Sequence, residues 1–363
     1  MQPLKKILAG FIFVLWAVGI SAMPEITSLR LEVLLTGKML DSLHTQSPFI
    51  NSIVVSSHRH IMISTSHQFY LLGWGGMSTL GKETAGEIGA FAFTPDSLLM
   101  VIRDKDVCCF DSRGRLSRLY TLPCNGMGIS AGKKVMYVYD RNHDKATKAL
   151  YVIAQGGNYA KILEVTSPIE SVIELDNRLV FASGNTLFQY NLKDKELKAL
   201  ASLPGNKIIQ SVTADRSTNR IYFSTDNMVC AIKDTSRVLV TDKAGGTLEF
   251  FNGGLIVLNP EKKFLVRIVN MEHQLTEQFR FRDIISAIRQ TKEPLTNTVV
   301  IDLASKKVPD EFIINLINTS KVNFNLSVDS LIALAGQHVS SPVIKAMKQV
   351  SKKQGTNSQN VSL

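Results

Sequence analysis

Arg178–Asn191 (RLVFASGNTLFQYN) and Arg220–Lys233 (RIYFSTDNMVCAIK) align without a gap, and Leu98–Asp111 (LLMVIRDKDVCCFD) repeats their pattern. Each stretch has an apolar segment, a turn rich in Gly, Asn or Asp, and a second apolar segment, which predicts a β-hairpin. Looser copies of the hairpin lie at residues 60–73, 134–153 and 254–270. A hairpin that recurs about every 40 residues is typical of a protein built from stacked repeats.

Each hairpin belongs to a larger repeat of four strands. An apolar segment precedes the hairpin, as at residues 169–175, and a more polar one follows it, as at residues 197–203. Four strands at a period of about 40 residues are typical of one β-propeller blade, and blades stack because an isolated blade cannot bury both faces. Six repeats begin near residues 48, 88, 127, 169, 209 and 247. The sequence therefore predicts a mainly β protein with a six-bladed β-propeller over residues 23–270.

The two ends of the repeat region indicate how the ring closes. The last repeat lacks an outer strand after Arg267, whereas residues 28–36 form a spare strand ahead of the first repeat. Pairing these two segments would close the ring and cover an exposed sheet edge.

The spacing of apolar residues becomes helical after residue 270. Residues 281–290 place three isoleucines on one helical face, and Pro309, Ser327 and Ser341 mark the starts of three more helices. Proline at the first helical position and serine at the cap are typical of helix starts. We expect two C-terminal segments, a small all-α module at residues 275–352 and a disordered tail at residues 353–363.

The N-terminus carries an export pattern. Two lysines at positions 5 and 6 precede an apolar stretch from Ile7 to Ile20, and small residues follow it. This stretch is shorter than the roughly 20 residues that cross a bilayer, so it predicts a signal peptide over residues 1–22, with an uncleaved anchor as the alternative. No cysteine follows the predicted cleavage position, so the sequence contains no lipobox. We expect a periplasmic or secreted protein without a transmembrane segment once the signal is removed.

Charge and cysteine content argue against two further classes of protein. The chain has 41 basic and 31 acidic residues, a net charge of +10, but no run of five basic residues, so we expect no nucleic-acid partner. Four cysteines are too few for the disulfide framework of a small secreted domain. They are Cys108, Cys109, Cys124 and Cys230, and the sequence leaves their disulfide state open.

Two stretches resemble known families. Asn219–Val229 (NRIYFSTDNMV), together with the other repeats, resembles the six-bladed NHL-type and related secreted β-propellers. Val322–Leu334 (VNFNLSVDSLIAL) and Val339–Met347 (VSSPVIKAM) resemble a short helical motif near the ends of many bacterial envelope and uncharacterised proteins. Together these resemblances imply a bacterial exported protein, and the second implies no particular chemistry.

A related resemblance, to gluconolactonase-like six-bladed hydrolases, implies a metal in the central channel. In that family, acid and amide side chains at the starts of inner strands converge on the metal, and such oxygen ligands suit a calcium-type ion that activates water or polarises an ester. The matching channel-lining candidates here are Asn51, Glu87, Asn125, Glu170 and Gln210. Because any propeller hydrates its channel with such residues, these types permit a calcium site without requiring one.

Two shorter motifs have both a chemical and a structural interpretation. His58 and His60 would share one face of a strand, with His67 in the same hairpin as a third metal ligand. However, residues 56–60 are more typical of a polar turn whose side chains point to water. Residues 128–132 (GISAG) fit a serine nucleophile motif, but that motif needs a strand-to-helix turn, and the residues that follow predict a strand. We therefore interpret residues 128–132 as part of a hairpin turn.

These observations define a scaffold without a convincing catalytic constellation. The leading hypothesis is an exported, non-catalytic β-propeller that binds a ligand or protein partner at its loop face or channel mouth, with no cofactor expected. The expected partner is a protein or glycan of the cell envelope, with the helical module as a docking element. The alternative is a metal-dependent hydrolase or lactonase that acts in the channel, because propellers host both enzymes and binding proteins.

Overall fold

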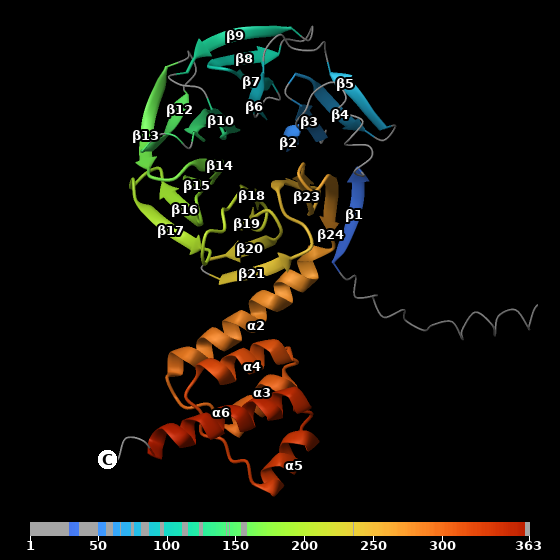
Figure 1. Cartoon of the computed structure of the whole chain (residues 1–363), viewed down its shortest axis with the longest axis vertical. Helices are drawn as coiled ribbons and strands as arrows, with labels where there is room; N and C mark the ends of the chain where they lie inside the picture. The colour runs from blue at the N-terminus through green and yellow to red at the C-terminus, as the bar shows by residue number, and fades with distance from the viewer. Residues whose placement is uncertain are drawn as a thin grey trace, which may run out of the picture.

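The repeated hairpins form the middle of six four-stranded antiparallel sheets, which a computed structural model of the chain arranges as blades around a central channel (Figure 1). The structure describes residues 29–35, 50–55, 61–65, 67–73, 76–80, 87–94, 98–110, 115–122, 126–142, 144, 146–153, 158–234 and 236–359. The predicted signal peptide lies outside these residues. The prediction of a mainly β, six-bladed propeller followed by helices is confirmed.

The strands of each blade follow one another from the channel to the rim, except in the last blade. The first two blades are β2 (Ile50–Val55), β3 (Ile61–Thr65), β4 (Phe69–Gly73), β5 (Gly76–Leu80), and β6 (Ile88–Phe93), β7 (Leu99–Arg103), β8 (Asp106–Phe110), β9 (Leu116–Thr121). The third and fourth are β10 (Met127–Ala131), β11 (Met136–Asp140), β12 (Lys148–Ile153), β13 (Tyr159–Val165), and β14 (Ile169–Leu175), β15 (Arg178–Ser183), β16 (Thr186–Asn191), β17 (Leu197–Ser202). The fifth is β18 (Ser211–Asp215), β19 (Arg220–Ser224), β20 (Val229–Lys233), β21 (Ser236–Thr241). The sixth combines β22 (Thr247–Phe251), β23 (Gly254–Asn259) and β24 (Phe264–Val269) with β1 (Arg30–Leu35).

The middle strands of a blade are buried on both faces. In β15, Leu179 and Phe181 belong to the apolar cluster shared with the third blade, whereas Val180 and Ala182 belong to the cluster shared with the fifth. Successive side chains of a strand point to opposite faces, so each face meets a different neighbour. This double burial explains why the repeated hairpins contain continuous apolar runs rather than an alternation of apolar and polar residues.

One apolar cluster lies at each of the six junctions between neighbouring blades. At the junction of the first and sixth blades, Ile63 of β3 lies in one cluster with Leu258 of β23 and Leu35 of β1. The propeller core is therefore divided into sectors, and the loss of one blade would expose two of them.

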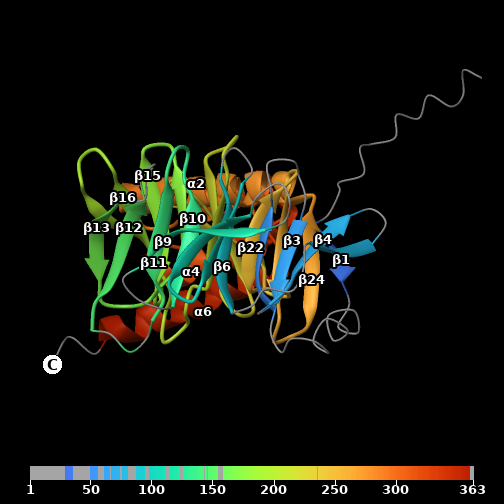
Figure 2. The same cartoon turned by 90° about the horizontal axis from the view of Figure 1, so that it is seen from above.

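The N-terminal strand completes the last blade. β1 pairs antiparallel with β24, with Arg30 opposite Val269 and Leu31 opposite Ile268. The two strands lie side by side in both Figure 1 and Figure 2. Leu35 is only 1% exposed, because its side chain enters the junction with the first blade. The spare segment and the missing outer strand in the sequence are thus the two partners of one pairing.

The C-terminal part of the chain contains five described helices. They are α2 (Met271–Thr291), α3 (Asn297–Ser305), α4 (Asp310–Thr319), α5 (Val328–Gly336) and α6 (Ser341–Gln359). Ser327 caps α5 by accepting a hydrogen bond from the backbone N–H of Ser330, as its place in the sequence indicated. In the described part of the chain, no helix combines the length and apolar character that spanning a bilayer requires.

Two features of this region differ from the sequence-based expectation. Residues 297–305, inside the predicted all-α module, form a helix for which the sequence analysis marked no start, and Val300 and Leu303 are buried in the helical core. α6 extends to Gln359, whereas the sequence analysis places the start of a disordered tail at residue 353. An established helix adds one hydrogen bond for each further residue, so it can extend through a polar segment. Residues 360–363 lie outside the described part.

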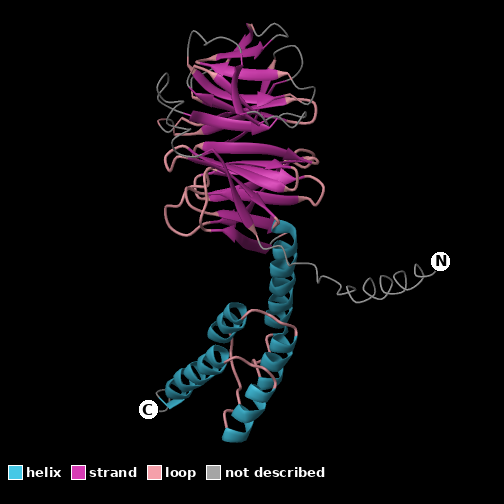
Figure 3. Cartoon of the chain, turned by 90° about the vertical axis from the view of Figure 1, so that its right-hand side faces the viewer, coloured by secondary structure: helices cyan, strands magenta, loops and turns pink. Residues whose placement is uncertain are grey.

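Helix α2 connects the propeller to the helical module (Figure 3). Its first half packs Met271, Leu275 and Phe279 into the junction of the fifth and sixth blades, whereas its second half contributes to the separate helical core. Arg220 of β19, with a side chain only 5% exposed, forms a bidentate ion pair with Glu272, at 2.6 and 3.1 Å. Hydrogen bonding to Arg220 lowers the pKa of Glu272. The start of α2 is therefore part of the propeller, and the predicted module begins within this helix.

The closure of the ring predicts different effects for two substitutions in β1. Leu35→Ala should lower the free energy of unfolding by about 2–4 kcal/mol, because it leaves a cavity at a blade junction. Val33→Ala, at a position that is 63% exposed in the same strand, should cost less than about 1 kcal/mol. Urea denaturation followed by tryptophan fluorescence and circular dichroism measures both, and equal losses would contradict closure by β1.

Candidate functional site

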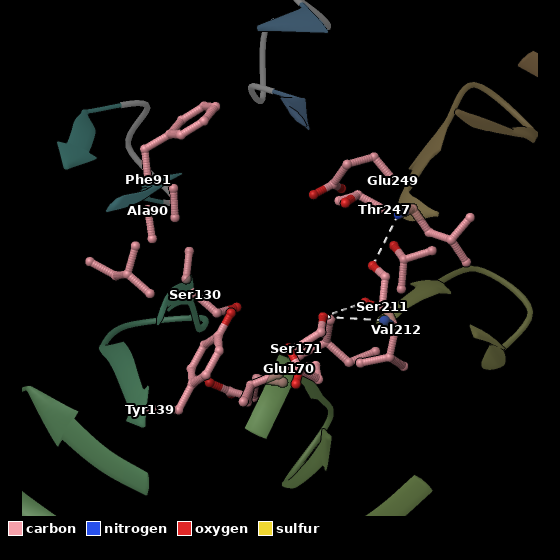
Figure 4. Close-up of a pocket in the computed structure, with 18 of the residues that line it drawn as sticks. Ala90, Phe91, Ser130, Tyr139, Glu170, Ser171, Ser211, Val212, Thr247 and Glu249 are labelled. Carbon is pink, nitrogen blue, oxygen red and sulfur yellow. Dashed lines mark hydrogen bonds between the residues drawn. The ribbon is translucent and has the colours of Figure 1, made fainter. Parts of the chain in front are cut away.

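The main candidate site is the central channel, where a cavity of about 340 Å³ is lined by five of the six blades. The inner strands β6, β10, β14, β18 and β22 supply most of its wall, and Tyr139 and Arg141 enter from β11 and the residue after it. Figure 4 shows the side chains of Tyr139, Ser130, Thr247 and Glu249 around one opening. The side chains of the first blade's inner strand lie outside the described residues.

Hydroxyl side chains connect the inner strands around part of this channel. The Ser171 hydroxyl of β14 donates to the backbone oxygen of Val212 (3.3 Å) and accepts from its N–H (3.2 Å). On β18, the Ser211 hydroxyl accepts from the N–H of Leu248 and the Thr213 hydroxyl from the N–H of Phe250. The channel-side edge of an inner strand has no further strand to pair with, so these hydroxyls satisfy backbone groups there. These hydroxyl groups stabilise the wall, and their hydrogen bonds to the backbone leave them less available to a ligand.

Glu249 is the most perturbed group that faces the channel. It is half-buried, its side chain points into the opening in Figure 4, and it has no hydrogen-bond partner among the described residues. Burial raises the pKa of Glu249 to about 8, because no cation compensates the charged form. A carboxyl group that retains its proton near neutral pH can donate a hydrogen bond as well as accept one. Perturbed titratable groups in a cavity are typical of functional sites.

Tyr139 faces the same space from the second strand of the third blade. Burial raises the pKa of Tyr139 to about 12, Arg141 opposes this shift, and Glu170 and Glu249 add to it. The phenol is therefore neutral and able to donate a hydrogen bond into the channel. Its ring crosses Gly128 of β10, where an added Cβ would lie 2.2 Å from the Tyr139 Cε2 atom. Glycine at position 128 thus makes room for the tyrosine.

An ion pair lies where the channel meets a second cavity. Arg141 and Glu170 approach to 3.7 Å, and both line the channel and an adjoining mouth cavity of about 400 Å³. Glu87 and Asp104 also line the mouth cavity. Charged groups therefore line the entrance, and the channel itself combines Glu174, Arg216 and Glu249 with neutral polar and apolar residues.

The candidates from the sequence are divided between these places. Glu170 and Gln210 line the channel, whereas Glu87 lines only the mouth cavity, and Gly89 represents the start of β6 in the channel wall. The side chain of Asn51, which lies on β2, is outside the described residues, as is Asn125. For the histidine hypothesis, His58 and His60 are likewise outside, and His67 lies in the β3–β4 turn and lines neither cavity.

The structure also places the other reactive residues singled out in the sequence. Among the described residues, no group of three or more His, Cys, Asp or Glu side chains is arranged to hold a metal ion. Cys108 and Cys230 are buried free thiols, and burial raises the pKa of each; Cys109 is half-buried, and Cys124 lies outside the described part. Ser130 lies within β10, and the next element is β11, so the geometry of a nucleophile turn is absent there.

Sequence reasoning missed Glu249 and Tyr139. Glu249 is an acid within the otherwise apolar end of β22 (TLEFF), and such an isolated charge was the signal that could have found it. Tyr139 lies on a second strand rather than at the start of an inner one, so only its cross-strand pairing with Gly128 brings it to the channel.

Comparisons with solved structures find several chains of similar fold. A gluconolactonase from Xanthomonas campestris is 13% identical, with a TM-score of 0.56 over 67% of this chain and 90% of that chain. An extracellular domain from B. thetaiotaomicron is 12% identical (TM-score 0.45, 65% of this chain, 39% of that chain), and a chain of a nidogen/laminin complex is 10% identical (TM-score 0.48, 57% and 95%). The likeness to the gluconolactonase supports the six-bladed fold and, at this identity, the fold alone. No protein-family model and no curated protein matches the sequence.

Substitution of two channel glycines tests the position of the Tyr139 ring. Gly128→Ala should lower the free energy of unfolding by about 1–3 kcal/mol, because the new methyl group overlaps the ring and displaces it. Gly89→Ala on β6 is the matched control, since its Cβ would meet nothing closer than 3.6 Å. Chemical denaturation of both variants measures the difference, and similar losses would show that the ring does not occupy this place.

The raised pKa of Glu249 predicts a pH dependence of stability. The unfolded chain loses this proton near pH 4.3, whereas the folded protein holds it up to about pH 8, so stability falls as the pH rises between these values. Glu249→Gln should remove this loss and stabilise the protein at pH 9, by up to about 5 kcal/mol, with little effect at pH 4. Urea denaturation across this range is the measurement. Glu261→Gln, at an exposed turn, is the control, and parallel pH profiles for the wild type and Glu249→Gln would contradict the assignment.

Proposed function

We propose that this protein is an exported, non-catalytic binding protein whose propeller channel takes a small polyhydroxylated ligand. The observation that carries the proposal is the set of uncommitted polar groups facing one cavity, Glu249 and Tyr139 above all. Export rests on the N-terminal pattern of the sequence. A protein or glycan of the bacterial cell envelope is the proposed partner of the helical module.

The size and chemistry of the channel support a small ligand. Its volume of about 340 Å³ is at the lower end of the range of about 300–1,000 Å³ for small-molecule sites. Neutral donors and acceptors at Ser130, Gln210, Thr247, Tyr139 and protonated Glu249 suit hydroxyl groups. Arg141 at the mouth suits a carboxylate on the same ligand, although its ion pair with Glu170 competes. A sugar acid or sugar lactone combines these features.

One observation favours a second candidate, a hydrolase that acts on such lactones. A carboxyl group with a pKa of about 8 is suited to general acid–base catalysis near neutral pH, and Glu249 faces the cavity where a substrate would lie. A calcium-type ion remains part of this alternative, with Glu170 and Gln210 as oxygen ligands from the channel wall. The two candidates differ in whether the bound molecule is converted.

The experiment uses gluconate and glucono-lactone as probes with the full chain. Calorimetric binding of gluconate, weakened about tenfold by Glu249→Ala and unchanged by Glu261→Gln, is the expected result. Lactone hydrolysis above the spontaneous rate, measured in a pH-stat and abolished by a chelator, would contradict the non-catalytic binding protein and favour the metal-dependent hydrolase. If the protein neither binds nor converts sugar acids and lactones, the proposed ligand class is overturned.

A further inference from the structure

A groove of about 1290 Å³ lies between the rim of the propeller and the helical module, and shares no residue with the channel. The start of β1, strand β21 and helices α2 and α4 line it, and we call it the basic groove. Among the described residues, five basic side chains line it: Arg30, Arg237, Lys243, Arg282 and Arg289. The acidic side chains in the same described lining are Asp242 and Glu311, so this part of the groove has an excess of positive charge.

Neutral partners hold two of these arginines in place. Arg289 donates from one nitrogen to Asn315 Oδ1 at 3.1 Å and to Thr319 Oγ1 at 2.9 Å, so α2 and α4 orient its guanidinium together. Arg237 donates to the backbone oxygen of Ser202 at 3.4 Å. Amide, hydroxyl and carbonyl oxygens position a guanidinium without neutralising it, so both positive charges remain available to an anion.

Arg282 lies close enough to both of these arginines to be affected by their positive charges. Its guanidinium is 5.7 Å from the centre of the Phe312 ring and has no hydrogen-bond acceptor among the described residues. Partial burial lowers the pKa of Arg282, and the positive charges of Arg237 and Arg289 lower it further, against a smaller opposing effect of Glu311. Three guanidinium groups close enough to repel one another destabilise the free groove, and a bound anion would remove that repulsion.

The groove is also apolar and long, which decides the kind of anion. Leu239, which is 44% exposed, and Phe312 present apolar surface beside the arginines. The groove follows α2 from Gln274 to Arg289, about 22 Å at a helical rise of 1.5 Å, which is room for about six or seven extended residues. Its volume exceeds that of small-molecule pockets. A compact phosphate would leave the apolar part unused, whereas a peptide can present carboxylates and apolar side chains together.

We propose that the basic groove binds an acidic peptide segment of a partner protein in extended conformation. Carboxylates of the peptide pair with Arg237, Arg282 and Arg289, and apolar side chains between them contact Leu239 and Phe312. The proposal rests on the partner-binding role proposed for the helical module and names the surface and the chemistry of the partner. It is independent of the channel, because a channel ligand and Glu249 have no part in it.

The test measures binding of a fluorescein-labelled peptide of eight alternating Glu and Leu residues to the full chain by fluorescence anisotropy. The double variant Arg237→Gln/Arg282→Gln should weaken binding about tenfold or more, and raising the salt from about 50 to about 300 mM should weaken binding to the wild type. Arg118→Gln, on the outer strand β9 of another blade, is the matched control and should bind as the wild type does. Unchanged thermal unfolding midpoints verify that the variants remain folded.

Three results would overturn the proposal. The first is no binding of the Glu/Leu peptide, or equal binding by the double variant. The second is equal binding of a Lys/Leu peptide, which would show that apolar contact alone is responsible. The third is that inorganic polyphosphate or a sulfated oligosaccharide binds the groove and the Glu/Leu peptide fails to displace it. This result would assign the groove to a different anion. Each result leaves the gluconate measurement on the channel unaffected.

Discussion

The requirement that every blade bury two apolar faces governs this structure. A four-stranded sheet with apolar residues on both sides is unstable alone, so each blade depends on two neighbours, and the series of blades must close on itself. The six clusters at the blade junctions are the result. The same requirement recruits β1 from the N-terminal side of the repeats, because without it the sixth blade would present β24 as an unpaired edge. It also recruits the first half of α2, which covers the junction of the fifth and sixth blades.

This arrangement creates a channel in which many of the polar side chains form hydrogen bonds with the backbone of the channel wall. The inner strands converge on the axis, and hydroxyls such as those of Ser171, Ser211 and Thr213 satisfy the backbone of the next strand. What remains for a ligand is a small group of side chains, and their desolvated surroundings account for the raised pKa values of Glu249 and Tyr139. The helical module adds a second kind of surface, since its attachment through α2 produces the basic groove between two independently packed cores.

Much of the architecture follows from local pattern, and the site does not. Inner strands begin at Ile88, Met127 and Ile169, close to the starts inferred from the repeats, because each strand carries its own apolar signal. The helix α3 was missed, since its β-branched run is compatible with either element until burial decides. Among the channel candidates, Glu170 and Gln210 line the channel and Glu87 lines only the mouth cavity, because the position of each strand start along the channel axis is set by blade packing and not by the local pattern.

The sequence by itself determined the repeat, the number of blades, the segments that pair at the closure and the helical nature of the C-terminal part. Each of these depends on apolar spacing and turn residues, which act over a few neighbours along the chain. Only the tertiary structure decided that Tyr139 reaches the channel over Gly128, that Glu249 faces Tyr139 across it, and that three arginines from β21 and α2 meet in one groove. Residues so far apart in sequence meet because of the ring geometry and the direction in which α2 leaves it, and no local pattern encodes either.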